Sequence, residues 1–258
     1  MNAPSEAGSR ADAGKGRLLL LPTALADVAV TPLDEVLPAG CLRAAAALDH
    51  WIVENPKTAR AFLGAVHAVC PLRVALQQHH IDALPKHREL DPAQARALLQ
   101  PALRGTDIGV LSEAGAPCVA DPGSLVVAQA HQLGLQVLPL VGPSSLLLTL
   151  MASGLNGQCF AFHGYLPTDD TARRQRLLAL ERESAQRRQT QLFIETPYRN
   201  AALLHALVQT LQPQTRVCVA CDLTAPQGWV RTRSAAQWRQ HLDSLPPRAP
   251  ALFALLAD

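Results

Sequence analysis

The chain has 258 residues, of which 48% are hydrophobic and 17% charged, and its formal net charge is +2. This composition excludes a largely disordered chain, because disorder requires few apolar residues and a high net charge. The length suits one large domain or two smaller ones. The charge is uneven, however: residues 161–258 contain 12 Arg, no Lys and 8 acidic residues. A polyanionic partner, if there is one, should therefore approach the C-terminal half.

The N-terminal segment, residues 1–16, is rich in Ala, Ser, Gly and charge, and we expect a flexible tail. The apolar run 18–21 that follows ends at Pro22, so it is too short for a signal peptide and predicts a buried strand. A second uncharged stretch, 138–155, is interrupted by Gly142 and Pro143, which argues against a membrane span. We therefore expect a soluble cytoplasmic protein.

Short apolar runs alternate with helical patterns along the rest of the chain. Further strands are predicted at 51–53, 108–111, 135–140, 159–162, 190–194, 217–221 and 250–256. Helices are predicted from Pro56 to residue 66, from Asp91-Pro92, from Asp121-Pro122 to about residue 133, and at 143–151, 171–188, 197–211 and 235–242. Such alternation indicates mainly parallel or mixed α/β sheets covered by helices. We expect two α/β domains, 17–153 and 154–258, joined by the extended link at 152–158.

The six cysteines are scattered and are interpreted as reduced thiols. Cys218 and Cys221 form a single CxxC pair without a second one, which does not favour zinc or redox chemistry. His79 and His80 are adjacent and are expected at the surface. The sequence thus predicts no metal site.

Four loops that follow predicted strands have unusual compositions, at 20–24, 112–123, 140–145 and 194–199. Ligands of open α/β sheets collect beyond the carboxyl ends of the strands, and the small residues and prolines of these loops would allow a close approach to a ligand. Each loop alone could be an ordinary tight turn, whereas four together favour a ligand cleft. The chain lacks GxGxxG, GxxxxGK[ST] and GxSxG motifs, which argues against a classical dehydrogenase, a P-loop NTPase and a serine hydrolase.

Taken together, the blocks resemble a known family. They are Ser112-Glu-Ala-Gly-Ala-Pro-Cys-Val-Ala-Asp-Pro-Gly123, Pro139-Leu-Val-Gly-Pro-Ser-Ser145, Phe160-Ala-Phe-His-Gly-Tyr-Leu-Pro167, Phe193-Ile-Glu-Thr-Pro-Tyr-Arg199 and Val219-Ala-Cys-Asp-Leu-Thr224. Their order and spacing over about residues 17–256 are similar to those of the S-adenosylmethionine (SAM)-dependent tetrapyrrole methylase superfamily. The branch with the bacterial 16S rRNA ribose 2′-O-methyltransferases is the more similar one.

The chain departs from the rRNA enzymes in its N-terminal half. It has Pro22-Thr-Ala-Leu-Ala-Asp27 where they have a Thr-Pro-Ile-Gly-Asn type loop, and Glu54-Asn-Pro-Lys57 where they have a Glu-Asp-Thr-Arg type segment. Their Ser-Asp-Ala-Gly is Ser112-Glu-Ala-Gly115 here. These departures make the chain similar to an uncharacterised paralogous group of SAM-dependent methyltransferases.

The resemblance implies a homodimer of two-domain α/β chains that bind SAM in a cleft between the domains. Carried over motif by motif, the implied cofactor-binding residues are Pro22, Thr23, Glu113, Ala114, Gly115, Ser144, Ser145, Ile194, Glu195, Thr196, Ala220, Pro250 and Ala251. If the acceptor is a hydroxyl, a base would help to remove its proton. Glu54 is the first candidate, followed by Glu195 and Tyr198, although a Glu at a strand end can also be a cap or an ion-pair partner. His163 could be a satisfied core histidine.

The helix predicted at 171–188 carries six Arg against Glu181 and Glu183. It could follow the phosphates of RNA, with Arg199, Arg231 and Arg233 on the same face, or it could be a solvated helix. The favoured function is RNA methylation of the ribose 2′-O type. The alternatives are a methyltransferase for a small molecule or tetrapyrrole-like ring, and an inactive SAM-binding protein.

Overall fold

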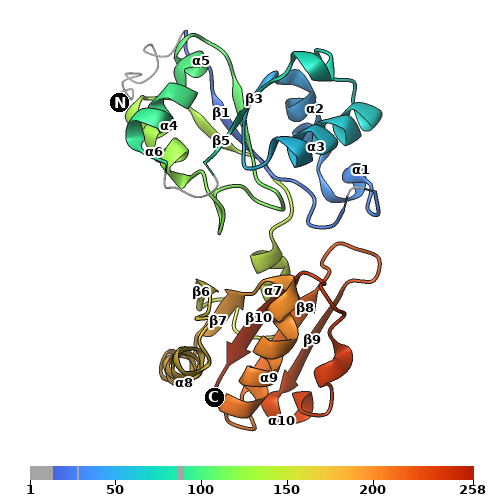
Figure 1. Cartoon of the computed structure of the whole chain (residues 1–258), viewed down its shortest axis with the longest axis vertical. Coiled ribbons are helices and arrows are strands. Elements are labelled where there is room, and N and C mark those ends of the chain that lie inside the picture. Colours follow the sequence, from blue (N-terminus) through green and yellow to red (C-terminus); the bar gives the residue numbers. More distant parts are fainter. Residues whose placement is uncertain (1–13, 28, 86–89) are drawn as a thin grey trace, which may run out of the picture. The chain divides into compact units, whose positions relative to one another are not determined.

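The computed structural model describes residues 14–27, 29–85 and 90–258. The chain divides into two compact units (Figure 1): one comprises Leu33–Gly142 with the residues up to Thr23, and the other comprises Ala24–Pro32 and Pro143–Asp258. The predicted tail, 1–16, lies mostly outside the described residues. No helix in the described part of the chain is long and apolar enough to cross a membrane.

The first unit is built on a five-stranded parallel sheet of order β3-β2-β4-β1-β5. Its strands are β1 (Leu18–Leu21), β2 (His50–Val53), β3 (His80–Ala83), β4 (Ile108–Leu111) and β5 (Val137–Pro139). Its helices are α1 (Leu33–Val36), α2 (Ala39–Ala47), α3 (Pro56–Val69), α4 (Pro92–Leu98), α5 (Gln100–Leu103) and α6 (Ser124–Gln132), with a 3-10 turn at Leu76–Gln78. Helices α2 and α3 cover one face, and α4 and α6 cover the other (Figure 1).

The second unit is built on a five-stranded mixed sheet of order β6-β7-β10-β8-β9. Strands β6 (Phe160–Tyr165) and β7 (Thr190–Ile194) are parallel, and β10 (Ala251–Leu256), β8 (Arg216–Cys221) and β9 (Trp229–Ser234) pair antiparallel. The helices are α7 (Ser145–Ser153), α8 (Asp170–Arg187), α9 (Asn200–Thr210) and α10 (Ala235–Trp238), with 3-10 turns at Pro197–Arg199 and Leu242–Ser244. The predicted fold class, two α/β domains, is confirmed.

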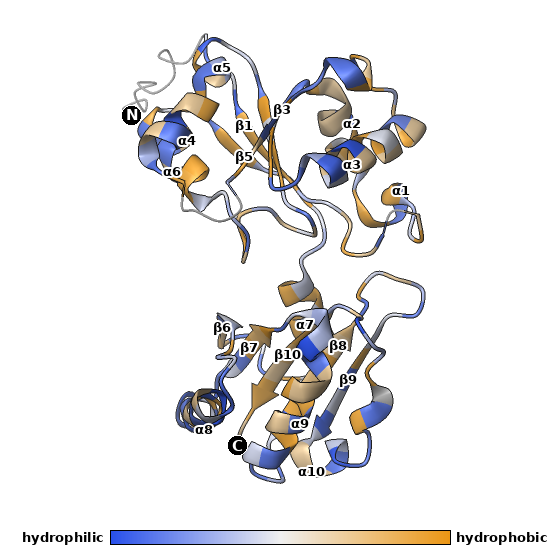
Figure 2. Ribbon diagram, viewed as in Figure 1, coloured by the Kyte–Doolittle hydropathy of each residue, from blue (hydrophilic) through white to orange (hydrophobic). Residues whose placement is uncertain are grey.

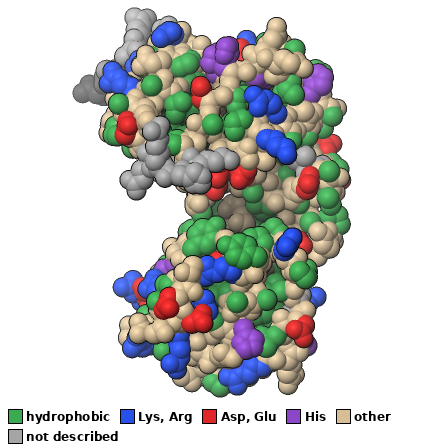
Figure 3. All heavy atoms as spheres, viewed as in Figure 1, with side chains coloured by type: hydrophobic (Ala, Val, Ile, Leu, Met, Phe, Trp, Pro, Cys, Tyr) green, Lys and Arg blue, Asp and Glu red, His purple; other side chains and the backbone are tan. Residues whose placement is uncertain are grey.

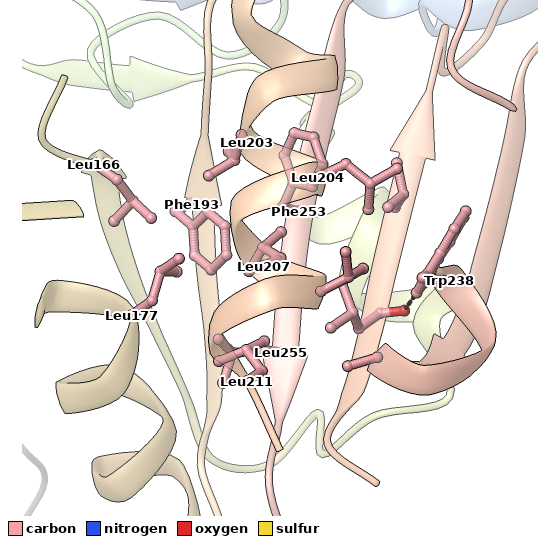
Figure 4. Close-up of a cluster of buried hydrophobic side chains, with 14 of the residues drawn as sticks. Leu166, Leu177, Phe193, Leu203, Leu204, Leu207, Leu211, Trp238, Phe253 and Leu255 are labelled. Carbon is pink, nitrogen blue, oxygen red and sulfur yellow. Dashed lines mark hydrogen bonds between the residues drawn. The ribbon is translucent and has the colours of Figure 1, made fainter. Parts of the chain in front are cut away.

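The core of the second unit lies between the sheet and helices α8, α9 and α10. Figure 4 shows Leu177 of α8 and Leu207 of α9 facing Phe193 of the sheet, all three fully buried. Trp238 of α10 lies at the opposite side of this cluster (Figure 4), and its indole N–H donates a 2.8 Å hydrogen bond to the carbonyl oxygen of Val217. The central strands β7, β10 and β8 are largely apolar (orange in Figure 2), as expected for strands that are covered on both faces, whereas the edge strand β9 is partly hydrophilic.

The boundary between the units lies at Gly142–Pro143 and not at the predicted 153–154, because helix α7 belongs to the second unit. Leu150 of α7 packs against Leu192, Cys218 and Leu252 on the second sheet. The chain therefore leaves the first unit at Gly142, one helix earlier than predicted, because the apolar face of α7 is buried on the second sheet.

Of the two predicted helix caps, one is confirmed and one is wrong. Asp91 caps α4 as predicted. Helix α3 begins at Pro56 as predicted, and the Asn55 side chain ahead of it accepts from Lys57 N–H, a cap that was not predicted from the sequence. Helix α6, in contrast, begins at Ser124, after Gly123 with a φ of +124°. The predicted cap Asp121 lies in the preceding turn, where its carboxylate is free for other contacts.

The expectation that both histidines of the His79-His80 pair lie at the surface is wrong for His79. This side chain is 9% exposed, and its Nδ1 accepts a 3.0 Å hydrogen bond from the indole N–H of Trp51. Burial lowers the pKa of His79 from its ordinary value, so the ring is neutral at neutral pH.

The CxxC pair lies along β8. Cys218 packs on the face covered by α7 and Cys221 on the opposite face, since residues three apart in a strand point to opposite sides. Burial raises the pKa of each thiol to about 11. The two sulfur atoms therefore cannot bind one metal ion, and no cluster of potential metal ligands occurs among the residues that the structure describes.

Candidate functional site

The predicted site residues of the first unit meet at the carboxyl ends of three neighbouring parallel strands, β1, β2 and β4. The backbone N–H of Thr23 donates a 2.9 Å hydrogen bond to the carbonyl oxygen of Gly115, which ties the loop after β1 to the loop after β4. The backbone N–H of Glu113 donates a 3.2 Å hydrogen bond to Oε2 of Glu54, at the end of β2. The structure therefore brings Pro22, Thr23, Glu54, Glu113, Ala114 and Gly115 together.

Small residues make this junction possible. Gly115 has a φ of +73°, a conformation that favours glycine. A Cβ on Gly142 would overlap the ring of Pro22 and lie 3.1 Å from Leu37 Cδ2, so only glycine lets the chain after β5 pass the end of β1 this closely. The Gly-Pro turn of the sequence motif is thus explained by packing inside the first unit.

Three acidic side chains, those of Glu54, Glu113 and Asp121, lie at the junction. Burial first, and then the nearby charge of Glu54, raises the pKa of Asp121 to about 6, and Glu113 adds a smaller effect in the same direction. The Asn55 amide donates a 2.7 Å hydrogen bond to Oε1 of Glu113 and so holds that side chain in place. The site therefore holds three carboxyl groups, and the pKa of one of them, Asp121, is raised.

One buried polar atom of the junction has no partner. Thr23 is only 6% exposed, and its Oγ1 makes no hydrogen bond to any residue in the described part of the chain. Buried hydroxyl groups are normally hydrogen-bonded, because an unpaired one costs free energy. This hydroxyl is therefore a contact that a ligand could satisfy.

The predicted site residues of the second unit gather at one end of its sheet. Ile194 and Ala220 lie opposite Leu252 in the register of the strand pairs, one on each side of β10. Ala251 pairs with Cys221, and the carbonyl oxygen of Pro250 accepts from Asp222 N–H. These strand ends are therefore adjacent.

Ser144 and Ser145 lie at the start of helix α7, which packs against one face of this sheet. Ser144 is the N-cap residue, but its hydroxyl makes no capping hydrogen bond. Leu146, the next residue along, packs against the apolar cluster that includes Leu252. The amino end of α7 thus lacks a side-chain cap, and its N–H groups could bind an anionic group.

The three predicted catalytic side chains have different surroundings. Glu195 is 7% exposed; its Oε1 accepts from the backbone N–H of Thr196 at 2.8 Å, and its Oε2 lies 3.0 Å from Arg199 Nη2. Both oxygens are therefore used within the loop, so the geometry favours a positioning role. Tyr198 is 75% exposed. Glu54 is half-buried and keeps one carboxylate oxygen without a hydrogen-bond partner among the described residues.

Both ring nitrogens of His163 have hydrogen-bond partners, as the sequence analysis allowed. Arg176 donates to its Nδ1 at 2.9 Å, and its Nε2 lies 2.5 Å from Oε1 of Gln191. Since an Arg can only donate, the ring proton is on Nε2 and is given to Gln191. Neither nitrogen is left for catalysis.

Asp121 and Asn55 are site residues that the sequence reasoning missed. Asp121 was assigned to a helix cap because Asp-Pro is a common helix start, and Asn55 was seen only as part of a departure from the family. The signal that could have identified Asp121 is its position at the end of the 112–123 block, since the carboxyl ends of β2 and β4 lie side by side.

Solved structures define the class of fold. The chain is similar to the crystal structure of the methyltransferase CobJ, with a TM-score of 0.58, 14% sequence identity and coverage of 94% of each chain. It is also similar to uroporphyrin-III C-methyl transferase from Thermus thermophilus complexed with S-adenyl homocysteine, with a TM-score of 0.51, 18% identity and coverage of 93% of this chain and 97% of that one. The chain thus has the fold of the tetrapyrrole methyltransferases.

Sequence comparison identifies relatives whose names specify the substrate. The ribosomal RNA small subunit methyltransferase I of Vibrio cholerae is 37% identical over 142 residues, which cover 55% of this chain and 47% of the relative. The protein of the same name from Xylella fastidiosa is 33% identical over 171 residues, which cover 66% and 57%. The chain therefore spans about half the length of the curated relatives it matches. No family model matches the chain. The resemblance to the tetrapyrrole methylase superfamily, and to its rRNA methyltransferase branch, is confirmed.

Proposed function

We propose that this protein is a SAM-dependent methyltransferase that acts on RNA. The observation that carries the proposal is the junction of the first unit, where the loops after β1, β2 and β4 are joined by the Thr23–Gly115 and Glu54–Glu113 hydrogen bonds. Support for the RNA substrate comes from the relatives named ribosomal RNA small subunit methyltransferase I, which are 27 to 37% identical in several bacteria. These relatives favour RNA over a tetrapyrrole, because the tetrapyrrole enzymes share the fold at only 14–18% identity.

The residues present fit the cofactor. Thr23 Oγ1 offers a buried hydrogen-bonding group without a partner among the described residues. Ala114 and Gly115 carry little or no side chain, so the backbone of their loop is accessible. In the second unit, Ser144 and Ser145 could bind the carboxylate of SAM, and Ile194, Glu195, Thr196, Ala220, Pro250 and Ala251 would contribute further contacts. That both units share one cofactor stays a prediction.

The chain's own catalytic groups are carboxylates. SAM supplies a methyl group that is already activated on a positively charged sulfonium, so no dedicated acid is needed. Glu54 would accept the proton of a ribose 2′-hydroxyl through its uncommitted oxygen. Asp121 and Glu113, close by, favour the binding of a cationic group at this end of the sheet. Tyr198, exposed in the second unit, would contact the acceptor, and Glu195 would hold its loop in place.

We further propose that the protein is a homodimer, as the resemblance implies. We also propose that it is cytoplasmic, because ribosomal RNA is found in the cytoplasm of bacteria.

The proposal is tested by isothermal titration of SAM and S-adenosylhomocysteine into cofactor-free protein. Binding should be lost in a Glu113→Arg, Ser145→Trp double variant and kept in Glu183→Arg, whose side chain lies on α8. Methyl transfer from labelled SAM to small ribosomal subunits is then expected, and transfer to uroporphyrinogen III is not. The reverse pattern would establish the small-molecule alternative, and binding without transfer to either acceptor would indicate a SAM-binding protein. No binding of either ligand would overturn the proposal.

A further inference from the structure

Strand β9 forms an exposed edge of the second sheet, since β8 is its only partner strand among the described residues. Its two faces differ. Val230 packs on the α7 side, and the Thr232 hydroxyl donates a 2.6 Å hydrogen bond to the carbonyl oxygen of Ser153 at the end of α7. Arg231 and Arg233 alternate with these residues and therefore lie on the other face.

Each of these two arginines lies over a tryptophan ring. The guanidinium carbon of Arg231 is 4.4 Å from the ring centroid of Trp229, and that of Arg233 is 5.0 Å from the ring centroid of Trp238. The two rings lie 6.5 Å apart. Such cation–π contacts position a guanidinium group over the ring, and its N–H groups remain hydrogen-bond donors. The side chains are therefore fixed in place before any ligand arrives.

The charges of Arg231 and Arg233 are not neutralised. Neither makes an ion pair or a hydrogen bond with any residue in the described part of the chain, and Nη1 of Arg233 is covered without an acceptor. A cation that has no carboxylate partner and is held in a fixed position is suited to bind an anion.

Three arginines of α8, in contrast, have side-chain partners. Arg173 pairs with Asp170 at 2.5 Å, Arg187 lies 3.4 Å from Glu183, and Arg176 donates to His163. Basic and acidic side chains are mixed on the surface where α8 lies (Figure 3). These pairings favour the interpretation of α8 as a solvated helix. Arg174 and Arg182 are exposed and make no ion pair with any described residue, but no aromatic ring of the described part of the chain lies beneath them, so β9 offers the better-fixed pair of charges.

We propose that β9 is a phosphate-binding strand for RNA, with Arg231 and Arg233 contacting successive phosphates of one RNA strand. Two residues along a strand span about 7 Å, which is comparable to the separation of neighbouring phosphates in an extended nucleic-acid chain. The tryptophan rings are covered by the guanidinium groups and so are not stacking platforms for bases. The contact should therefore depend strongly on salt and little on sequence. This inference rests on the proposed RNA substrate.

The test compares two double variants that each remove two positive charges from the second unit. Arg231→Gln, Arg233→Gln removes the strand pair, and Arg174→Gln, Arg182→Gln removes two exposed arginines of α8. Binding to a fluorescein-labelled, unstructured RNA of about 20 nucleotides is followed by anisotropy from about 50 to about 200 mM KCl. The strand variant should reduce the slope of log K against log salt by about 1.4, because each lost contact to a single strand contributes about 0.7. The α8 variant should leave the slope unchanged.

Equal slopes for the strand variant and the wild type would overturn this inference and leave the proposed function standing. Failure of the wild type to bind RNA would overturn both, whereas SAM titration would still report on the cofactor site. If the strand variant does not fold, the single Arg231→Gln change of the exposed residue is used, and half of the slope change is expected. Arg231→Lys, Arg233→Lys should retain the slope, since the charges remain.

Discussion

Thr23 and Gly115 are joined by a backbone hydrogen bond of 2.9 Å, although 92 residues separate them in the sequence printed above. The bond exists because β1 and β4 are neighbours in a parallel sheet, so their carboxyl ends lie side by side. It uses the backbone of Thr23 and leaves the buried hydroxyl of this residue without a partner among the described residues. The consequence is a polar group that serves a ligand rather than the fold.

Thr23→Val should therefore separate stability from binding. The valine side chain has nearly the same shape and removes a hydroxyl that has no partner, so the free energy of unfolding should stay the same or rise. The affinity for SAM should fall roughly tenfold, the effect of one lost hydrogen bond. Urea denaturation and isothermal titration measure the two quantities. A large loss of stability with unchanged affinity would show that the hydroxyl serves the fold.

Gly142→Ala should damage both stability and binding. The new methyl group would overlap the ring of Pro22 and lie close to Leu37, so the loops after β1 and β5 must move apart. Overpacking of this kind costs about 1–3 kcal/mol. Gly157→Ala is the matched control, since nothing lies within 4 Å of its added Cβ. Equal melting temperatures for the two variants would contradict the packing argument.

Much of this architecture could be predicted from local sequence signals. The apolar run Leu18–Leu21 and the segment Thr190–Ile194 are strands with the predicted bounds, and Gly154, with a φ of +66°, ends α7 as expected. Strand β9 was missed because its residues, Trp-Val-Arg-Thr-Arg-Ser, contain two arginines and lack the short apolar run from which the other strands were predicted. The two arginines are accommodated there by the tryptophan rings beneath them.

The site was predictable only in part, for a similar reason. Motif blocks identify which loops are involved, and parallel strands explain why the loops meet. The raised pKa of Asp121 depends on its burial and on the charge of Glu54, which is 67 residues away in the chain, so no local pattern reports it. The ion pair of Glu195 with Arg199 is local in sequence, but only the fold shows that it is buried.

Glu181 should be a stability residue in spite of its position in the Arg-rich helix α8. Its buried Oε1 accepts from the backbone N–H of Gln212 at 2.8 Å and from the hydroxyl of Thr215 at 2.5 Å. Glu181→Ala leaves both donors unsatisfied and opens a cavity, which should cost about 2–4 kcal/mol. Glu183→Ala, on the same helix but at its surface, should cost less than about 0.5 kcal/mol. Denaturant titration of both variants checks the difference.

Asp121→Asn should make the protein more stable at neutral pH. Since the pKa of Asp121 is raised to about 6, the folded state binds a proton more tightly than the unfolded state, whose carboxyl has a pKa near 4. The wild type therefore loses stability as the pH rises from about 4 through 6. The amide mimics the protonated acid, so the variant should gain roughly 1 kcal/mol at pH 7.5 after allowance for solvent screening, and nothing at pH 4.

Asp107→Asn is the control with the opposite sign. Its hydrogen bond and 2.6 Å ion pair with Arg17 hold the pKa of Asp107 below its ordinary value. The stability that this pair contributes is present above about pH 4 and is lost as the pH falls. The variant should therefore be less stable than the wild type at pH 7.5, by up to about 1 kcal/mol because the pair is partly exposed. Shifts of the unfolding midpoint in the same direction for both variants, relative to the wild type at pH 7.5, would contradict the electrostatic assignment.

Glu54→Gln tests the coupling between two carboxyl groups of the site. Burial is the main cause of the raised pKa of Asp121, and the charge of Glu54 is the second. Removing that charge should lower the pKa of Asp121 but leave it above the ordinary value for an aspartate. The variant should also lose methyl transfer by roughly 10²–10⁴-fold if Glu54 is the base, with little change in SAM affinity. Carboxyl chemical shifts followed by NMR against pH measure the first effect, and single-turnover transfer measures the second.

An unchanged Asp121 titration would show that the two carboxyl groups do not interact. Full activity with a lowered Asp121 pKa would instead remove Glu54 from catalysis while keeping the electrostatic relationship, and it would make Asp121 the carboxyl group to examine as base.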